Sequence, residues 1–242
     1  THAIIEHSSQ AILAFCSEDY NLRKNTSIYK PFEKLLKQNN IPFNRQIVVI
    51  EGNKFYVDYI IHHKISSFIF PKLSIWNSYD GTVKTQIHFG YFNIDCGNKL
   101  SRPKSCQIKT SSKHSADDEE FSKETVPQFL NLFKTFLKES SSDIRIFEQL
   151  KKKKVPFQIL ETISNNIKFS KEAREIATNQ IKKDLKIDII TSKSIVSAFS
   201  IYNAMNFAIY QTNPKELPEF KCKRDKILIE ELFQIVNCKI PK

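Results

Sequence analysis

The hydrophobic pattern of this chain changes its period once, and that change limits the folds open to it. Between residues 45 and 96, apolar and polar residues alternate with a period of two. Gly52-Asn53 and residues 78–81 are typical turn segments between the alternating runs. The expected strands are residues 45–51, 54–63, 66–77 and 82–96. Strands joined by short turns predict an antiparallel meander of about four strands.

From residue 117 onward, the apolar residues follow helical spacing instead. One helix is also expected before the sheet, over residues 29–40, and the later ones are residues 121–138, 143–154, 170–186, 192–211 and 224–236. Strands followed by helices, without βαβ alternation, predict an α+β fold. We expect residues 1–115 to hold the first helix, the meander and a basic loop. Residues 116–242 form a helical region that packs on the sheet as part of one domain.

Three residues give these expectations local detail. Ser27 is expected to cap the first helix, and Pro31 suits the first turn of that helix because proline needs no helical donor there. Pro71 falls inside the third expected strand, which predicts an edge strand or a bulge.

Several classes of protein are excluded by what the sequence lacks. There are four glycines in 242 residues, too few for a glycine loop around a phosphate, and the common signatures of nucleotide-binding and hydrolytic sites are absent. The five cysteines form no C-x-x-C pair, which argues against a zinc site or a disulfide framework. No apolar run approaches the roughly 18 residues of a membrane span. We expect a cytoplasmic binding protein rather than an enzyme, with no catalytic residue, metal, cofactor or membrane partner.

The chain is strongly basic, with 37 Lys and Arg against 26 Asp and Glu and a net charge of +11. Residues 1–115 carry a net charge of +7 and residues 116–242 carry +4. Richness in Lys, Ile and Asn indicates an AT-rich genome, whose codon usage accounts for part of the lysine excess. A basic protein favours polyanions, so nucleic acid is the expected partner. The candidate contacts are Lys84, Lys99, Arg102, Lys104, Lys109 and Lys113.

Aromatic residues gather in the expected sheet beside these lysines. Sheets that bind single strands stack bases on exposed rings and follow the phosphates with Lys and Arg, so the mixture favours single-stranded DNA. Helices must cover one face of the sheet, and about two-thirds of the rings are expected to be core. The rings are Phe55, Tyr56, Tyr59, Phe68, Phe70, Trp76, Tyr79, Phe89, Tyr91 and Phe92.

Two short motifs carry a family resemblance. The first is a turn with Asn77, Ser78, Asp80 and Gly81, and the second is a strand end with Cys96 and Asn98. Together they resemble a phage- and plasmid-borne family catalogued as a domain of unknown function, number nine-three-two. Segments around Tyr20 and Asn25, at 113–115 and at 202–205 match further family elements in order. Asn93 and Gly97 depart from the family's Arg and its Ser or Thr. The resemblance implies a mobile genetic element and a cytoplasmic location, with no established chemistry.

Three functions remain open at this point. The first is a non-enzymatic protein that binds or anneals single-stranded DNA in recombination or replication, since the element order is similar to that of phage annealing proteins. The second is a protein-interaction or assembly component, which allows association of identical chains. The third is a Mg²⁺-dependent nuclease that uses carboxylates such as Asp58, Asp80 and Asp95. Asp80 also suits a turn in which its side chain bonds the backbone.

Overall fold

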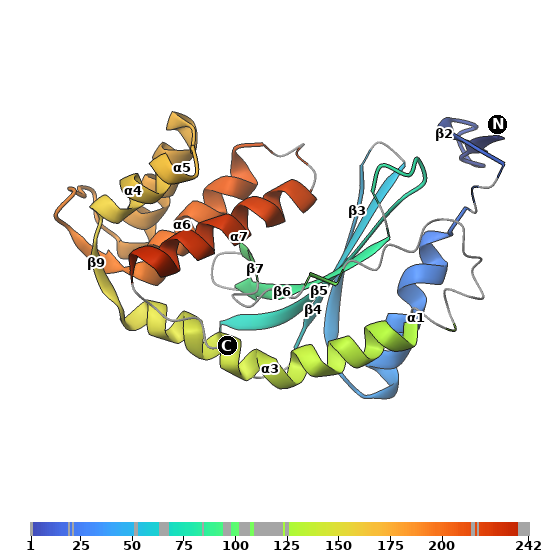
Figure 1. The fold of residues 1–242 in the computed structure, drawn as a ribbon, viewed down its shortest axis with the longest axis horizontal. Coiled ribbons are helices and arrows are strands. Elements are labelled where there is room, and N and C mark those ends of the chain that lie inside the picture. Colours follow the sequence, from blue (N-terminus) through green and yellow to red (C-terminus); the bar gives the residue numbers. More distant parts are fainter. Residues whose placement is uncertain are drawn as a thin grey trace. The chain divides into compact units, whose positions relative to one another are not determined.

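The computed structural model describes residues 2–18, 20, 22–50, 53–62, 68–83, 85–93, 98–101, 107–108, 123, 126–213, 216 and 218–236 (Figure 1). The chain forms two compact units that interleave in sequence. Unit 1 comprises residues Thr1–Tyr91 and Cys106–Ser140, and unit 2 comprises Phe92–Ser105 and Ser141–Lys242. An antiparallel sheet occupies the N-terminal half and helices dominate the C-terminal half, which confirms the expected α+β class.

The main sheet contains the expected meander. Its strand order is β3-β4-β5-β6-β7, and β8 pairs with β6. The strands are β3 (Phe43–Ile50), β4 (Lys54–Ile61), β5 (Ile69–Ser78), β6 (Gln86–Asn93), β7 (Asn98–Ser101) and β8 (Gln107–Ile108). The β3–β4 register runs from Phe43 opposite Ile61 to Ile50 opposite Lys54. Strand β6 is shorter than expected because residues 81–83 belong to the preceding bend.

Strand β5 lies between β4 and β6, so the expectation that Pro71 marks an edge strand is wrong. The paired register with β4 ends at Lys72, directly after the proline. Because proline has no backbone N–H, it is tolerated where no ladder pair with β4 needs that donor.

Helix α1 (Asn25–Gln38) begins earlier than expected. Its N-cap residue is Lys24, so Ser27 is not the cap, and Pro31 lies in the helix interior rather than in the first turn. The helix buries a stripe that includes Phe32 and Leu36. Burial of this apolar stripe offsets the weak cap and the interior proline, because tertiary packing supplies most helical stability in proteins.

Aromatic rings join α1, the sheet and the first half of α3 (Val126–Lys152) within unit 1. The ring centroids of Phe32 and Phe129 lie 5.9 Å apart, and those of Phe89 and Phe136 lie 4.9 Å apart. These contacts place α1 and α3 on the same face of the sheet, as the ribbon also shows (Figure 1). A separate hairpin of β1 (His2–Ile5) and β2 (Ile12–Cys16) precedes α1.

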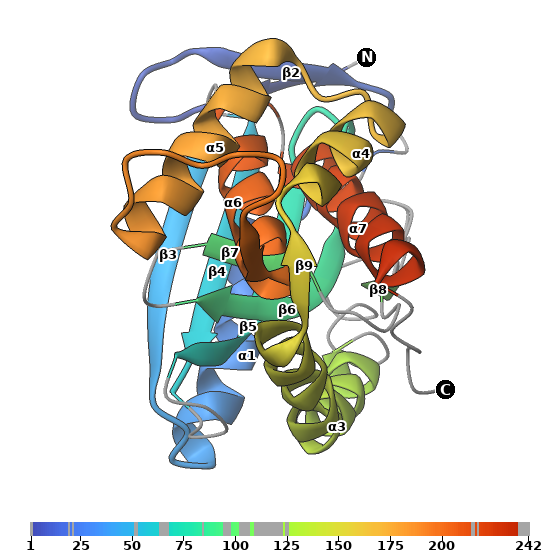
Figure 2. The same cartoon turned by 90° about the vertical axis from the view of Figure 1, so that its left-hand side faces the viewer.

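Unit 2 is built around one apolar helix, α6 (Ala198–Gln211), in which ten residues are buried. Figure 2 shows α6 between α5 (Lys171–Leu185) and α7 (Pro218–Ile235), and both helices pack on it. The remaining elements are α4 (Gln158–Asn166) and the short strand pair β9 (Lys154–Pro156) and β10 (Ile195–Ser197). Helix α4 was not expected, because a nine-residue helix offers few turns of periodic signal.

Helix α3 is continuous where two helices were expected on either side of a serine run. Ser140 is buried, and its hydroxyl donates to the carbonyl of Leu137 at 2.6 Å. Back-bonding of this kind satisfies a serine inside a helix, so the run does not break α3. None of the helices in the described part of the chain is long and apolar enough to cross a membrane.

Candidate nucleic-acid interface

The turn after β5 carries the first family motif, and its side chains close that turn. Ser78 Oγ accepts from the backbone N–H of Val83 at 2.9 Å and donates to the Val83 carbonyl at 3.0 Å. Asp80 Oδ1 accepts from the backbone N–H of Thr82 at 2.9 Å and from its hydroxyl at 2.6 Å. Gly81 has a φ of 71°, which glycine adopts without strain. The expectation that Asp80 serves as a turn residue is confirmed.

The second oxygen of Asp80 ties this turn to the β3–β4 hairpin. Asn53 Nδ2 donates to Asp80 Oδ2 at 2.7 Å, and Lys54 Nζ lies 3.9 Å from the same oxygen. Burial by itself would raise the pKa of Asp80. The hydrogen bonds from Thr82 and Ser78 and the charge of Lys54 outweigh burial and lower that pKa below its usual value.

Asn77, the first residue of the motif, connects the turn to the segment before α1. Its side-chain amide donates to Asn25 Oδ1 at 2.9 Å and to the Arg23 carbonyl at 3.4 Å, while Thr85 Oγ1 donates to Asn77 Oδ1 at 2.9 Å. Asn77 is fully buried. Tyr20, from the early family segment, donates to the Tyr79 carbonyl at 3.0 Å. The early and middle family segments therefore meet in one polar network that holds unit 1 together.

The segment at 202–205, which resembles a late family element in the sequence, has a similar structural role in unit 2. Tyr202 donates to Asp225 Oδ2 at 3.2 Å, and Asn93 Nδ2 donates to Asn203 Oδ1 at 3.3 Å. Asn93 is thus a buried amide bonded to α6. Cys96 lies outside the described residues, and Asn98 begins β7.

The candidate carboxylates of a nuclease are engaged inside the fold. Asp58 Oδ1 accepts from Ser74 Oγ at 2.5 Å and lies 3.8 Å from Lys72 Nζ. Asp80 bonds as described above, and Asp95 lies outside the described residues. In the part of the chain that the structure describes, no group of three His, Cys, Asp or Glu is placed to hold a metal ion.

The aromatic residues of the sheet do not form an exposed platform. Of the ten rings named above, six are buried and four are half-buried. Trp76 is buried and stacks on His88 with a centroid distance of 3.7 Å. Stacking of a base needs an open ring face. None of these ten rings is therefore fully exposed on the sheet.

Of the six candidate cations, Lys99 lies on β7 and is half-exposed. The other five candidates, Lys84, Arg102, Lys104, Lys109 and Lys113, lie outside the described residues.

The division into units changes where the positive charge resides. Each unit contains 13 Asp and Glu, but unit 1 has 15 Lys and Arg whereas unit 2 has 22. The net charges are therefore +2 for unit 1 and +9 for unit 2. The cause is that residues 92–105, which are basic, belong with the C-terminal helices, and the acidic run after residue 116 belongs with the sheet.

Three cations of unit 2 form a group that we call the basic cluster, comprising Lys99, Lys221 and Arg224. Lys221 is 6 % exposed, and its Nζ donates to the carbonyl of Tyr210 near the end of α6 at 3.3 Å. Burial lowers the pKa of Lys221, Glu216 opposes this, and the nearby charges of Lys99 and Arg224 lower the pKa further. Strand β7 also packs against α7. One expected contact, Lys99, is thus brought beside two cations from the far end of the chain.

One exposed side of α7 combines an aromatic ring, two cations and an aliphatic side chain. Phe220 is 51 % exposed and Ile227 is 41 % exposed. Lys223 is exposed, and Arg224 is half-exposed and forms an ion pair with Glu216. Spacings of three, four and seven residues place Phe220, Lys223, Arg224 and Ile227 on one side of a helix. We call these four residues the α7 face.

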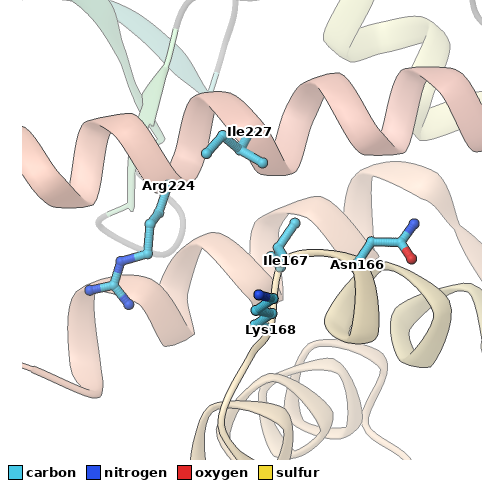
Figure 3. A pocket seen from close by; sticks show the side chains of 5 residues that line it. All are labelled: Asn166, Ile167, Lys168, Arg224 and Ile227. Atoms are coloured by element: carbon cyan, nitrogen blue, oxygen red, sulfur yellow. The ribbon is translucent and has the colours of Figure 1, made fainter.

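A cavity of about 200 Å³ adjoins the α7 face (Figure 3). Arg224 and Ile227 line it from α7, and Ile167, Lys168 and Asn166 line it from the end of α4 and the turn that follows. Lys168 has a φ of 55°, the left-handed conformation at the end of α4 where glycine is usual. Asn166 Nδ2 donates to Glu231 Oε2 at 2.9 Å at the other end of the cavity.

The α7 face was missed at the sequence level although its signal is visible. Residues 220–226 read Phe-Lys-Cys-Lys-Arg-Asp-Lys, an aromatic residue followed by four cations in six positions. The expected helix began at residue 224, which divided this segment, and the C-terminal region had the lower net charge. Nothing local in the sequence indicates that Lys99 lies beside it.

Comparison with known proteins gives one match. A family model described as "Domain of unknown function (DUF932)" matches residues 12–187. The matched range begins at β2, covers the rest of unit 1 and ends just after α5. Helices α6 and α7 lie beyond it, so the resemblance expected at 202–205 falls outside the match. No curated protein and no solved structure matches the chain.

Proposed function

Because this chain belongs to the DUF932 family, a domain of unknown function, we propose its activity from its own residues: it binds single-stranded DNA through unit 2, without catalysis. The phosphate backbone is the group recognised. Lys99 and the α7 face form the contact surface, and buried Lys221 adds positive charge beneath it. Annealing or protection of single strands during recombination or replication is the process this activity would serve.

The observation that carries the proposal is the concentration of +9 on unit 2. The lysine bias of an AT-rich genome acts on both units, which are of similar length and hold equal numbers of acidic residues. Such a bias does not explain seven additional cations in one unit. A positive surface of this kind attracts nucleic acid because phosphate contacts release condensed counterions.

The arrangement within unit 2 gives further support. Lys221 and Arg224 lie one turn apart on α7, and Lys99 approaches them from β7. Like charges held together disfavour the folded state, whereas a bound polyanion would relieve their repulsion. Glu216 offsets part of this charge through its ion pair with Arg224.

We expect the protein to bind a fluorescent oligonucleotide of about 20 nucleotides, long enough to exceed the roughly 4–16 nucleotides of a typical single-strand site. Fluorescence anisotropy at several salt concentrations should give a linear fall of log affinity with log salt, with a slope of about −0.7 for each phosphate neutralised. An affinity that does not change with salt would contradict the proposal. Shortening of the oligonucleotide in Mg²⁺ would contradict its non-catalytic part.

A second candidate function, assembly with another protein, is supported by the β1–β2 hairpin. Ile5, Ile12 and Phe15 on this hairpin are 51 %, 56 % and 69 % exposed. A two-stranded hairpin is marginally stable by itself in water, and clustered apolar side chains on it gain stability by packing against a partner. A second copy of this chain is the first occupant to test.

Association through the hairpin should appear as a concentration-dependent mass in sedimentation equilibrium over about 1–100 µM, without nucleic acid. Replacing Ile12 and Phe15 by aspartate should return the protein to a monomer, because it places two charges in the contact. A variant with Asp at exposed Leu185 in unit 2 is the matched control and should associate as the wild type does. A monomeric wild-type protein throughout this range would exclude assembly of identical chains through the hairpin.

A further inference from the structure

The exposed side of α7 differs from an ordinary solvated helix face. Phe220 is a large ring with half of its surface open, and it lies one turn from Arg224. Among the exposed large apolar residues of the described chain, only Phe15 and Phe220 are aromatic, and Phe220 alone belongs to the basic unit. The cavity begins at Arg224 and Ile227, on the same side of the helix (Figure 3).

We infer that the α7 face and its cavity form a nucleotide subsite that selects single strands over duplex. A base stacks on Phe220, and the adjoining phosphate is held by Arg224 and Lys168, which line the same cavity. This inference rests on the proposed function and adds to it the feature of nucleic acid that is recognised. A surface of cations alone would bind both forms of DNA through their phosphates.

The size and lining of the cavity suit one nucleotide unit. A cavity of about 150 Å³ accepts a benzene ring, and pockets that enclose a whole drug-sized ligand have about 300–1,000 Å³. At about 200 Å³, the cavity beside α7 accommodates a single ring or sugar-phosphate group, and the neighbouring nucleotides remain on the surface. Ile167 and Ile227 supply apolar contact, while Asn166 supplies an amide.

Two carboxylates border the subsite and limit what it accepts. Glu216 pairs with Arg224, and Glu231 accepts from the Asn166 amide. A guanidinium has five N–H donors, so Arg224 can bond a phosphate while it keeps a contact with Glu216. Lys168 forms the opposite wall. The resulting balance of charge favours one phosphate at a time over a compact, highly charged anion.

The preference for single strands follows from the geometry of stacking. In a duplex, both faces of each base are covered by neighbouring base pairs, so an aromatic side chain cannot reach them without unstacking. In a single strand, the faces are open and stacking on an aromatic ring is worth about 1–3 kcal/mol per base, or roughly five- to 150-fold in affinity. Phe220 should therefore contribute to the affinity for single strands and not to that for duplex.

The first test compares the affinity for single-stranded and duplex DNA of equal length and sequence in wild type, Phe220→Ala and Phe220→Trp. We expect Phe220→Ala to weaken single-strand binding at least about fivefold with duplex binding unchanged, and Phe220→Trp to retain the preference. Phe15→Ala, which removes an exposed ring from unit 1, is the matched control and should leave both affinities unchanged.

The second test removes one of the two cations that line the cavity, without straining the fold. Lys168→Gly suits the left-handed backbone at that position, so the variant should remain folded and be at least as stable as wild type. We expect it to weaken binding of single strands and to lower the magnitude of their salt slope by about 0.7, the value of one phosphate. Lys186→Gly at the end of α5, with the same φ of 55° and outside the cavity lining, is the matched control.

The outcomes distinguish failure of the stacking subsite from failure of DNA binding by unit 2. Equal weakening of single-strand and duplex binding by Phe220→Ala would overturn the stacking subsite and leave phosphate binding by unit 2 in place. An unchanged salt slope in Lys168→Gly would overturn the phosphate position. Failure of the wild-type protein to bind either form of DNA would overturn both the subsite and the proposed function.

Discussion

Replacement of Lys99 and Lys223 by glutamate is expected to lower the affinity for single-stranded DNA on the order of a hundredfold at low salt, because two attractive phosphate contacts become repulsive. Lys99 lies on β7 and belongs to the basic cluster, and Lys223 lies on the α7 face. The double change reduces the net charge of unit 2 from +9 to +5.

The fold should tolerate this double change. Lys223 is exposed, and Glu at position 99 would face Lys221 and Arg224, which removes a like-charge repulsion. The backbone carbonyl of residue 99, which accepts from Asn206 Nδ2 at 2.9 Å, is unaffected by the substitution. The loss of affinity should therefore appear without a loss of stability.

The matched control makes the same change of charge on unit 1. Lys30 and Lys34 are exposed on α1, and their replacement by glutamate takes unit 1 from +2 to −2. Anisotropy titrations at about 100 mM salt should show a change of only a few fold for this control, since at that salt the long-range effects of surface charge are screened beyond roughly 10 Å. Equal losses in the two variants would mean that total charge, and not unit 2, governs binding.

Replacement of Asn77 by alanine should lower the free energy of unfolding by about 3 kcal/mol, because each buried polar partner left unsatisfied costs about 1–3 kcal/mol. The substitution removes the acceptor of Thr85 Oγ1 and the donor to Asn25 Oδ1. Asn77 is 0 % exposed, so water cannot replace these bonds without a local rearrangement.

The single tryptophan of the chain gives a direct readout of this effect. Trp76 precedes Asn77 in β5 and is buried against His88, so its fluorescence during urea unfolding reports on unit 1. Asn44→Ala on the exposed edge of β3 is the matched control and should change stability by less than about 0.5 kcal/mol. Unchanged stability of Asn77→Ala, with lost DNA binding, would assign the motif to recognition rather than to folding.

The strands and most helices were predictable because their signal is local. Alternation of apolar residues placed β3 to β6, and the spacing of three and four residues placed α5, α6 and much of α7. Two errors arose where an element tolerates a residue that usually interrupts it. Pro71 lies in an inner strand because its end of β5 needs no donor toward β4, and Ser140 lies within α3 because its hydroxyl bonds back to Leu137.

The candidate site was predictable to a smaller extent. The sequence pointed to basic residues and named Lys99, and it offered the sheet aromatics as the stacking surface. The fold buries or half-buries those rings, and it brings Lys99 to a helix more than 100 residues later in the chain. Among the described residues of the basic unit, the exposed phenylalanine is Phe220. It lies in a helix, so the alternating pattern that marked the sheet aromatics as candidates is absent there.

Local periodicity in the amino-acid sequence was sufficient to establish the α+β class. The backbone conformation of a segment, and which side of a helix or strand is buried, depend mainly on residues close in sequence. The same holds for the closure of the β5–β6 turn, where Ser78 and Asp80 bond to Val83 and Thr82 within a few residues. The bonds of Asn77 and Asp80 to distant segments required the folded chain. The location of the charge required the folded chain. Each compact unit combines two distant stretches, so residues 92–105 contribute to a basic unit that no single window of sequence contains. Charge acts through space, and contacts between distant segments decide which cations share a surface.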